Sequence, residues 1–293
     1  MNRKMRKRVP LSVIIIARNE ADRLPRTLAS LAWAEQVVLV DSGSEDGTVE
    51  RAREAGAEVH THPWRGYGAQ KQIALARARH DWVLSVDADE VVSTQLRASI
   101  EALLASTPRH TGYTVNRRTH YLGRFIRYGG WYPDRKLRLF RRECARFDGR
   151  LVHEGVRVSG TIGHLRGDLH HYSYRNLSHH ARKTHEMAVL WAAQQPPGAR
   201  ARVWHLIAHP LAKLFKSYCW RGGMWEGWRG LLIAGMGAYS VWLKYALLRE
   251  RQECASLGAR WPEEEGADRP TKDAAPHREG RGDAGAGKVV ADT

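Results

Sequence analysis

The sequence has few cysteines, and their spacing excludes two common kinds of small scaffold. Only three occur in 293 residues, at Cys144, Cys219 and Cys254. A disulfide-stabilised domain needs an even set at short spacing, and a zinc knuckle needs a C-x-x-C pair, and neither pattern is present. We therefore expect free thiols and a reducing compartment.

Long apolar runs are also lacking. No stretch reaches the roughly 18 uninterrupted apolar residues that cross a bilayer. The basic N-terminus has the charge of a secretory signal, but the apolar run at residues 11–17 is short, rich in β-branched residues and followed by no small-residue cleavage site. We interpret this run as the first strand of the mature fold.

Acidic residues are outnumbered by basic ones. There are 31 Asp and Glu against 47 Lys and Arg, which gives a formal charge of +16, and five basic residues crowd the first eight positions. This balance suits phosphate surfaces, either nucleic acid or acidic lipid headgroups. No nucleic-acid-binding module that interleaves basic and stacking aromatic residues is recognisable, so we expect no nucleic-acid partner and favour an anionic membrane surface.

The first part of the chain alternates strand-like and helix-like segments. Short apolar runs indicate strands at residues 11–17, 37–40 and 82–84, and residues 58–61 are expected to form a short strand between the last two. Between them, apolar residues recur at helical spacing. This β-α order predicts an α/β fold with right-handed crossovers and a mostly parallel, Rossmann-like sheet.

The pattern then changes to shorter β-like pieces, at residues 112–115, 136–140 and 155–158, which predict a mixed sheet that forms the second wall of a cleft. Helical spacing resumes at residues 176–195 and breaks at the Pro-Pro-Gly that follows. Residues 231–248 are apolar except for one lysine. We interpret them as a helix in the membrane interface, and the alternative is a core helix of the soluble domain.

These patterns give a domain organisation. The tail is poor in large apolar residues and is expected to be disordered. The expected units are a basic extension (1–9), a catalytic domain (10–195) with a donor half (10–110) and an acceptor half (111–195), a helical membrane-associating region (196–257) and the tail (258–293).

Two acidic loops follow the strand-like runs. Asp87 and Asp89 come directly after the run at 82–84, and Asp41 ends the run at 37–40. Side chains alternate along an extended chain, so Asp87 and Asp89 point the same way, as carboxylates that bind a hard divalent cation do. Asp also closes strands as a simple turn-former. Because ligands of open α/β sheets sit outside the carboxyl ends of the strands, two acidic loops at one edge favour a metal-diphosphate site.

These segments together resemble a known family. The segments that carry the resemblance are VIIIARNEADRLPRTLASL, VVLVDSGSEDGT and DADE, followed by GGWYPDRKLRLFRR, FDGRLVHEGV and LHHYSY. They resemble the family 2 inverting glycosyltransferases with the GT-A fold, and within them the lipopolysaccharide core β-glucosyltransferases. The resemblance runs from about residue 11 to about residue 249.

The resemblance implies roles for the donor side. Asp41 would read the nucleotide base, a uracil. Asp87 would approach the ribose or support the metal, and Asp89 would ligate Mg²⁺ or Mn²⁺ on the diphosphate. The other residues expected to line the nucleotide-sugar pocket are Ala17, Arg18, Glu20 and Ala88.

Direct displacement also needs a base for the acceptor hydroxyl. Glu154 is the first choice and Asp134 the second, while a surface carboxylate is the alternative for Glu154. His171 is a candidate second metal ligand, although His170 beside it leaves the choice open and a structural histidine is the alternative. Lys71, Arg135 and Arg138 are candidates to hold phosphates, with solvated surface charge as the alternative.

The expected enzyme lies peripherally on the cytoplasmic face of a bacterial inner membrane and transfers glucose from UDP-glucose to an inner-core heptose of lipopolysaccharide. The alternatives are a polyprenyl-phosphate or other envelope glycan as acceptor, or a sugar-nucleotide-binding homologue without activity. A zinc enzyme is not expected, because no H-E-x-x-H or Cys/His spacing occurs among His170, His171, His179, His180 and His185.

Overall fold

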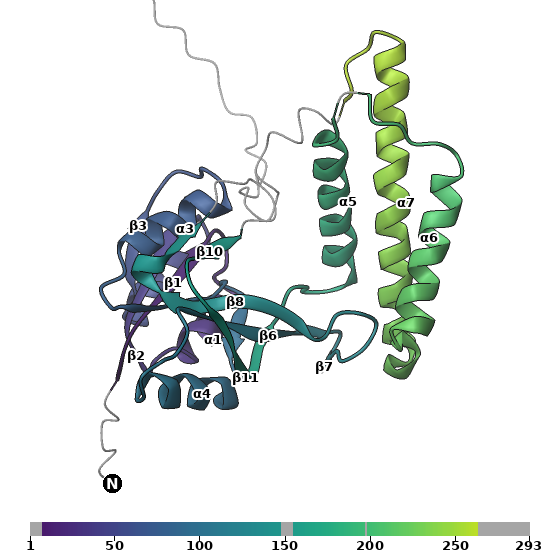
Figure 1. Cartoon of the computed structure of the whole chain (residues 1–293). Coiled ribbons are helices and arrows are strands. Elements are labelled where there is room, and N and C mark those ends of the chain that lie inside the picture. Colours follow the sequence, from purple (N-terminus) through teal and green to yellow (C-terminus); the bar gives the residue numbers. More distant parts are fainter. Residues whose placement is uncertain (1–7, 148–154, 197, 263–293) are drawn as a thin grey trace, which may run out of the picture.

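The computed structural model describes residues 8–147, 155–196 and 198–262. Within them, one large sheet packs against helices on both faces, and a group of three helices stands beside it (Figure 1). The helices are α1 (Leu24–Ala29), α2 (Thr48–Glu54), α3 (Tyr67–Ala76), α4 (Thr94–Leu104), α5 (Leu177–Ala193), α6 (His205–Phe215) and α7 (Trp228–Ser256).

The large sheet has a parallel half and a mixed half. Its strand order is β3-β2-β1-β4-β8-β6-β11-β5. The first four strands are parallel, β8 is antiparallel to both β4 and β6, and β11 is parallel to β6. The strands are β1 (Val9–Ala17), β2 (Ala34–Asp41), β3 (Glu58–Thr61), β4 (Trp82–Ser85), β5 (Glu90–Val92), β6 (Gly112–Tyr121), β7 (Arg124–Phe125), β8 (Asp134–Arg141), β9 (Ala145–Phe147), β10 (Val156–Val158) and β11 (Ile162–His171).

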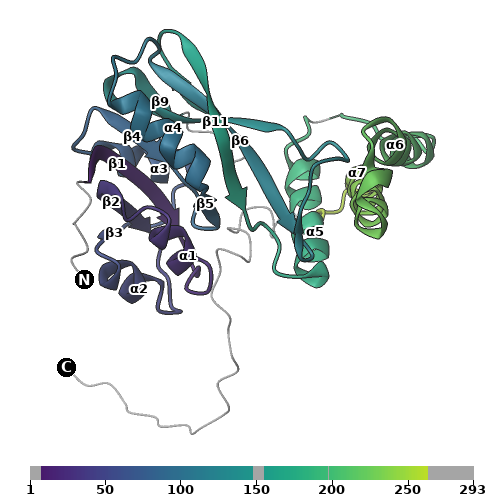
Figure 2. The same cartoon turned by 90° about the horizontal axis from the view of Figure 1, so that it is seen from below.

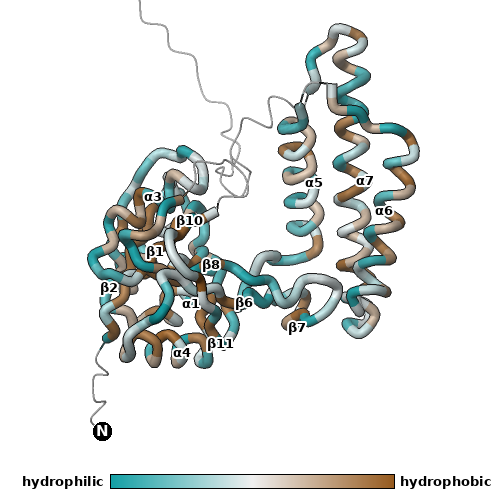
Figure 3. The backbone as a smooth tube through the Cα atoms, viewed as in Figure 1, coloured by the Kyte–Doolittle hydropathy of each residue, from teal (hydrophilic) through white to brown (hydrophobic). Residues whose placement is uncertain are grey.

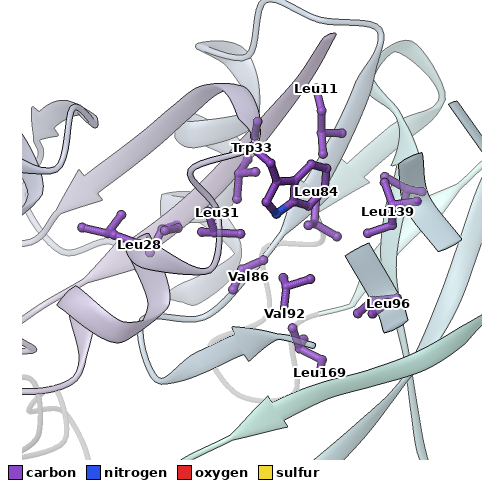
Figure 4. Packing of buried hydrophobic residues seen from close by; sticks show 14 of the residues in the cluster. Leu11, Leu28, Leu31, Trp33, Leu84, Val86, Val92, Leu96, Leu139 and Leu169 are labelled. Carbon is purple, nitrogen blue, oxygen red and sulfur yellow. The ribbon is translucent and has the colours of Figure 1, made fainter. Parts of the chain in front are cut away.

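Side chains of β1 alternate between two hydrophobic clusters, as the period of a strand requires. Leu11, Val13 and Ile15 pack with residues of α1, α2 and α4 on one face. Ile14 packs with residues of α3 and of the β9–β10 ribbon on the other. Figure 4 shows the first cluster, in which Leu84 of β4 lies between Leu11 of β1 and Val92 of β5, and Leu96 of α4 lies on the side of Leu139. Both faces are covered, which explains why the central strands are almost continuously apolar.

The predicted α/β fold with a mixed second half is confirmed, and the predicted bounds of β3 agree with the structure. β11 was not predicted, because it carries Gly163, Gly167 and several polar residues and its sequence lacks a strand-like apolar pattern. α6 lies in the region 196–257 that was expected to be helical, but its bounds were not predicted, and it contains Pro210.

The three C-terminal helices form their own layer. Seen along their axes, α5 lies nearest the sheet, and α6 and α7 lie beyond it (Figure 2). Among the described residues, α7 is the one helix that is long and apolar enough to cross a membrane, by length and composition alone. It extends beyond the predicted run at residues 231–248, because the Arg, Glu and Gln that follow are good helix formers.

Two expected domain boundaries need correction. α5 was assigned to the catalytic domain, but its Ala188 and Ala192 pack against Leu243 and Leu247 of α7, so most of this helix belongs to the C-terminal layer. Trp261 was assigned to a disordered tail, but it is only 2% exposed within the same cluster. Its indole is large enough to close the end of the α5–α7 interface. Residues 263–293 lie outside the described residues.

Candidate active site

Three parallel strands end at one edge of the sheet and bring the acidic loops together. Ala17, the last residue of β1, pairs with Asp41, the last residue of β2. Val86, just after β4, donates a backbone hydrogen bond to Ile14 of β1 (3.1 Å). The loops that start at Arg18, Ser42 and Val86 therefore leave the sheet side by side, as the position of a ligand site in an α/β sheet requires.

The loops after β1 and β2 are hydrogen-bonded to each other. Asn19 donates from its backbone to Ser44 Oγ (2.9 Å), and Glu20 donates from its backbone to Thr48 Oγ1 (2.9 Å). Asp41 is buried, and its carboxylate accepts hydrogen bonds from the backbone of Gly43 (2.8 Å) and Ser44 (2.9 Å) and from the Ser44 hydroxyl. Asp41 thus holds the second loop in shape, and its predicted contact with a base stays a prediction.

Asp87 lies between two cations. Arg138 Nη2 is 2.7 Å from Asp87 Oδ2, and Lys71 Nζ is 2.9 Å from Asp87 Oδ1. Burial opposes the ionisation of Asp87, but the charges of Arg138 and Lys71 outweigh it and hold the pKa of Asp87 well below its usual value. Lys71 and Arg138, which we expected to hold phosphates, are thus first of all partners of the acidic loop.

Glu90 completes this network from inside the protein. Its side chain is fully buried, and its Oε1 lies 2.6 Å from Arg138 Nη2 and 3.7 Å from Arg117 Nη1. Its Oε2 accepts the backbone N–H of Asp87 (3.0 Å). Burial raises the pKa of Glu90, and the charge of Arg138 opposes that rise. Arg138 therefore forms ion pairs with Asp87 and Glu90 at once, and Lys71 supplies a second positive charge to Asp87.

A strand irregularity places Arg138. In the pairing of β6 with β8, Tyr113 faces Leu139 and the next residue, Thr114, faces Leu137, so Arg138 is the extra residue of a β-bulge. Bulges redirect a side chain and occur next to functional sites. Here the bulge brings a guanidinium from β8 to the loop after β4.

Asp89 meets a histidine from β11. His171 Nε2 lies 3.4 Å from Asp89 Oδ2, and Arg23 Nη1 lies 3.5 Å from the same oxygen. Burial opposes the ionisation of Asp89, but His171 and then Arg23 lower its pKa below the usual value. β11 pairs with β5 so that His171 faces Glu90, and this register fixes the imidazole beside the acidic loop.

The register also distinguishes the tandem histidines. The ring of His170 lies against Phe125, with centroids 4.3 Å apart, whereas His171 contacts Asp89. His171 Nδ1 is buried and has no hydrogen-bond partner among the described residues. A carboxylate and an imidazole fit Mn²⁺ or Mg²⁺ as two protein ligands, since Mg²⁺ sites in particular take their remaining ligands from water and substrate phosphates. No group of three or more His, Cys, Asp or Glu with metal-site geometry occurs among the described residues.

Glu20 and Arg23 form the wall opposite His171. Arg23 binds both carboxylate oxygens of Glu20, at 2.7 and 2.6 Å, while its third nitrogen faces Asp89. Burial raises the pKa of Glu20 to about 7, against the pull of Arg23. Arg23 was not predicted, although its position three residues after Glu20, at the start of a helix, allows this pairing.

The remaining predicted donor residues lie at or near this edge. Ala17 and Ala88 are buried, and the Ala88 carbonyl accepts a hydrogen bond from Thr27 (2.8 Å). Arg18 is half-buried, and its Nε has no hydrogen-bond partner among the described residues. That nitrogen is buried, and a buried donor without a partner is uncommon in folded proteins. Arg135 is exposed on β8.

Of the two candidate bases, Asp134 lies among the described residues and Glu154 does not. Asp134 is engaged by Arg117, whose Nη2 lies 2.7 Å from Asp134 Oδ2, and by Lys136, whose Nζ lies 3.1 Å from Asp134 Oδ1. Glu154 lies outside the described residues, which resume at Gly155. Glu90 and Arg117 were not assigned roles from the sequence. Glu90 adjoins the two predicted aspartates, whereas nothing in the sequence marks Arg117.

Comparisons with known proteins agree with this arrangement. Over 258 residues the chain is 35% identical to a lipopolysaccharide core biosynthesis glycosyltransferase, LpsC, of Rhizobium meliloti, covering 83% of this chain and 93% of that protein. It is 28% identical to an uncharacterised glycosyltransferase of Rickettsia typhi, covering 82% and 87%. The S. aureus TarS 1-349 crystal structure covers 86% of this chain and 92% of that one, at 15% identity and a TM-score of 0.42, which is too distant to relate residues.

A family model provides the remaining finding. The model described as glycosyl transferase family 2 matches residues 12–159, which is half of the chain. The matched segment includes the loops after β1, β2 and β4, the bulge of β8 and the acidic network that they form. With that match and the 35% identical relative, the chain belongs to glycosyltransferase family 2 and is a glycosyltransferase.

Proposed function

We propose that this enzyme transfers glucose from UDP-glucose, with inversion, to a heptose of the lipopolysaccharide inner core. The observation that supports it most is the pairing of Asp89 with His171 at the carboxyl ends of the parallel strands, next to a charge-compensated Asp87. The name of the Rhizobium meliloti relative supports the lipopolysaccharide core as the acceptor.

The donor would lie across the loops after β1, β2 and β4. Asp41 would shape the loop that meets the base, and Arg18 would donate its unpartnered Nε to a phosphate. Asp87 would face the ribose, with its charge fixed by Lys71 and Arg138. These groups bind and orient the nucleotide, so that the anomeric carbon faces the acceptor side of the cleft.

Asp89 and His171 would hold Mg²⁺ or Mn²⁺. The ion supplies Lewis-acid stabilisation of the charge that develops on the leaving diphosphate. The strongly acidic character of Asp89 keeps an anionic oxygen available for the ion at neutral pH. Arg23, 3.5 Å from that oxygen, adds a second positive charge on the same side.

The chemical step needs one proton acceptor. The acceptor oxygen forms a bond to the anomeric carbon while the bond from that carbon to the diphosphate oxygen breaks, and the hydroxyl proton passes to a carboxylate. We propose Glu154 as this base. Asp134 is less suited, because its two oxygens are engaged by Arg117 and Lys136.

The alternatives to this function are transfer to a polyprenyl-phosphate or another envelope glycan, or binding of the donor without transfer. We propose a peripheral location on the cytoplasmic face of the inner membrane, where nucleotide sugars and lipid-linked acceptors meet. The excess of basic residues supports an anionic surface as partner.

The first experiment measures binding and hydrolysis of UDP-, GDP-, ADP- and dTDP-sugars with Mn²⁺, Mg²⁺ or chelator. We expect one UDP-sugar to be selected and turned over only with the ion. Asp89→Ala should lower turnover at least 100-fold, since removing one charge-stabilising group costs about that much. The matched control is Asp22→Ala, which removes a carboxylate that forms an exposed ion pair with Arg175. Full turnover by Asp89→Ala would refute the metal assignment.

A further inference from the structure

The C-terminal layer exposes an apolar surface that the catalytic site does not use. Figure 3 shows hydrophobic residues along α6 and α7, on the side of the molecule away from the sheet. Two tryptophans in the turn between these helices are largely exposed, Trp220 by 81% and Trp225 by 73%. We call the following exposed residues the docking face: Trp204, Ile207, Leu211, Phe215, Trp220, Trp225 and Trp228.

The α6 part of the docking face is one stripe. Ile207, Leu211 and Phe215 recur at spacings of four, which places them on one side of the helix. The opposite side carries His205 and His209, whose rings lie 5.2 and 4.9 Å from the ring of Tyr245 on α7. α6 thus packs on α7 through its histidines and turns its apolar stripe outwards.

The charges around this face have one sign. From residue 204 to residue 249 the chain has six Lys and Arg but a single acidic residue, Glu226. Glu226 is buried, and its Oε1 accepts the backbone N–H of Arg127 (2.7 Å), so it faces the protein. Lys213 and Lys216 are exposed on the side of this segment that faces α7, where Lys213 lies beside Gly237, so they flank the stripe rather than lie within it. Tryptophan with flanking cations is the composition that binds the interface of an anionic bilayer.

We propose that the docking face inserts shallowly into an anionic membrane surface and holds the enzyme beside its acceptor. This inference deepens the proposed function and rests on its lipid-linked acceptor. It places the membrane contact on α6 and the turn after it rather than along residues 231–248 of α7, where Ile233, Leu243 and Leu247 are buried against the rest of the protein.

Two alternatives to shallow insertion, a membrane-spanning α7 and a dimer through the docking face, fit the structure less well. If α7 crossed the bilayer, α5 would enter with it, because the two helices pack through Leu243 and Leu247, and α5 carries Arg182 and Lys183. Placing such charges in hydrocarbon is costly. A dimer through the docking face would bring the lysines of both copies close together, and like charges repel.

The docking face is fixed to the catalytic domain through residues 122–131, which join β6 to β8. Arg229 at the start of α7 donates to the Leu122 carbonyl (2.8 Å), and Ser217 donates to the Gly129 carbonyl (2.9 Å). Gly129 donates from its backbone to the Arg221 carbonyl (2.9 Å). This segment leads through Tyr132 and Pro133 into β8. These hydrogen bonds hold the docking face against the segment that precedes β8.

The test is co-sedimentation of the full chain with vesicles of phosphatidylcholine alone or mixed with phosphatidylglycerol. We expect binding to the mixed vesicles that weakens with salt. Trp220→Ser with Trp225→Ser should lower the partition coefficient about 100-fold, at about tenfold for each large apolar side chain. Lys213→Gln with Lys216→Gln should lower it about 30-fold at low salt. The control pair Ile162→Ser with Leu177→Ser removes exposed apolar residues elsewhere and should change nothing.

Several outcomes would overturn the proposal. These are no binding to mixed vesicles, equal binding by the tryptophan variant, resistance of the bound protein to alkaline carbonate, and a concentration-dependent dimer that only the tryptophan variant abolishes. Hydrolysis of the soluble donor is measured in parallel. If the full chain hydrolyses the donor normally but does not bind vesicles, the docking face is refuted and the proposed function stands. If it binds vesicles normally but binds no sugar nucleotide, the proposed function is refuted and the docking face stands.

Discussion

Replacing Arg138 by methionine should destabilise the protein strongly, because its guanidinium is ion-paired with two carboxylates. It lies 2.7 Å from Asp87 Oδ2 and 2.6 Å from Glu90 Oε1, and Glu90 has no exposed surface. At an effective dielectric constant of about 20, each pair of charges about 4 Å apart contributes about 4 kcal/mol. Lys71 still compensates Asp87 in the variant, so the main loss is the pair with Glu90. We expect a loss of about 4 kcal/mol in the free energy of unfolding.

Glu90→Gln provides the second arm of a double-mutant cycle. This change removes the buried charge but keeps the shape, so alone it should cost less, about 1 to 2 kcal/mol. In the double variant neither charge is left without its partner, and the loss should be smaller than the sum of the two single losses by about 2 kcal/mol. Urea unfolding followed by circular dichroism measures all four proteins, with Arg135→Met, an exposed residue of the same strand, as the control.

Two results would refute this reasoning. If Arg138→Met unfolds within about 1 kcal/mol of the natural protein, the network is too hydrated for the charges to matter. If the two losses simply add, Arg138 and Glu90 are not coupled, and the bulge of β8 must have another purpose.

Two further predictions concern the C-terminal part of the chain. Removing residues 263–293 should leave donor turnover unchanged, whereas removal from residue 258 should lower the melting temperature because it also deletes the buried Trp261. Burial lowers the pKa of His180 from 6.5 to about 4, so only the unfolded chain binds a proton between these values, and stability should fall as the pH drops through them. Between pH 7 and 5 the free energy of unfolding should fall by about 2 kcal/mol. His180→Asn should abolish this pH dependence, whereas His185→Asn, at an exposed position, should keep it. Equal stability of both truncations, or an unchanged pH profile in His180→Asn, would contradict these expectations.

The parallel half could be predicted from the sequence because its central strands, β1 and β4, are apolar on both faces. Residues 11–17 fit only a strand covered on both sides, and the acids after the runs at 37–40 and 82–84 then had to meet at one edge. The choice of His171 rather than His170 could not be predicted. It depends on the register of β11 against β5, which is set by pairing between strands about 80 residues apart.

The charge network was also beyond prediction. Arg138 reaches Asp87 only because β8 carries a bulge, and no local signal marks that extra residue. Glu90 adjoined the predicted aspartates, but its burial follows from the packing of β5 beside β11. The helical layer was misjudged for a related reason. Hydropathy identifies the apolar run at residues 231–248 but cannot tell which of its faces meets α5.

The acidic loop after β4 is balanced by the protein itself. Its three carboxylates, Asp87, Asp89 and Glu90, face positive charges from Lys71, Arg138 and Arg23, of which Arg23 is shared with Glu20. A loop of bare carboxylates would need a cation simply to fold, because its own repulsion would open it. Here the framework carries its own counter-charges, so the proposed ion would gain little from the protein alone and would be held mainly by the diphosphate of the proposed donor. Under that proposal, chelation would stop turnover without unfolding the protein.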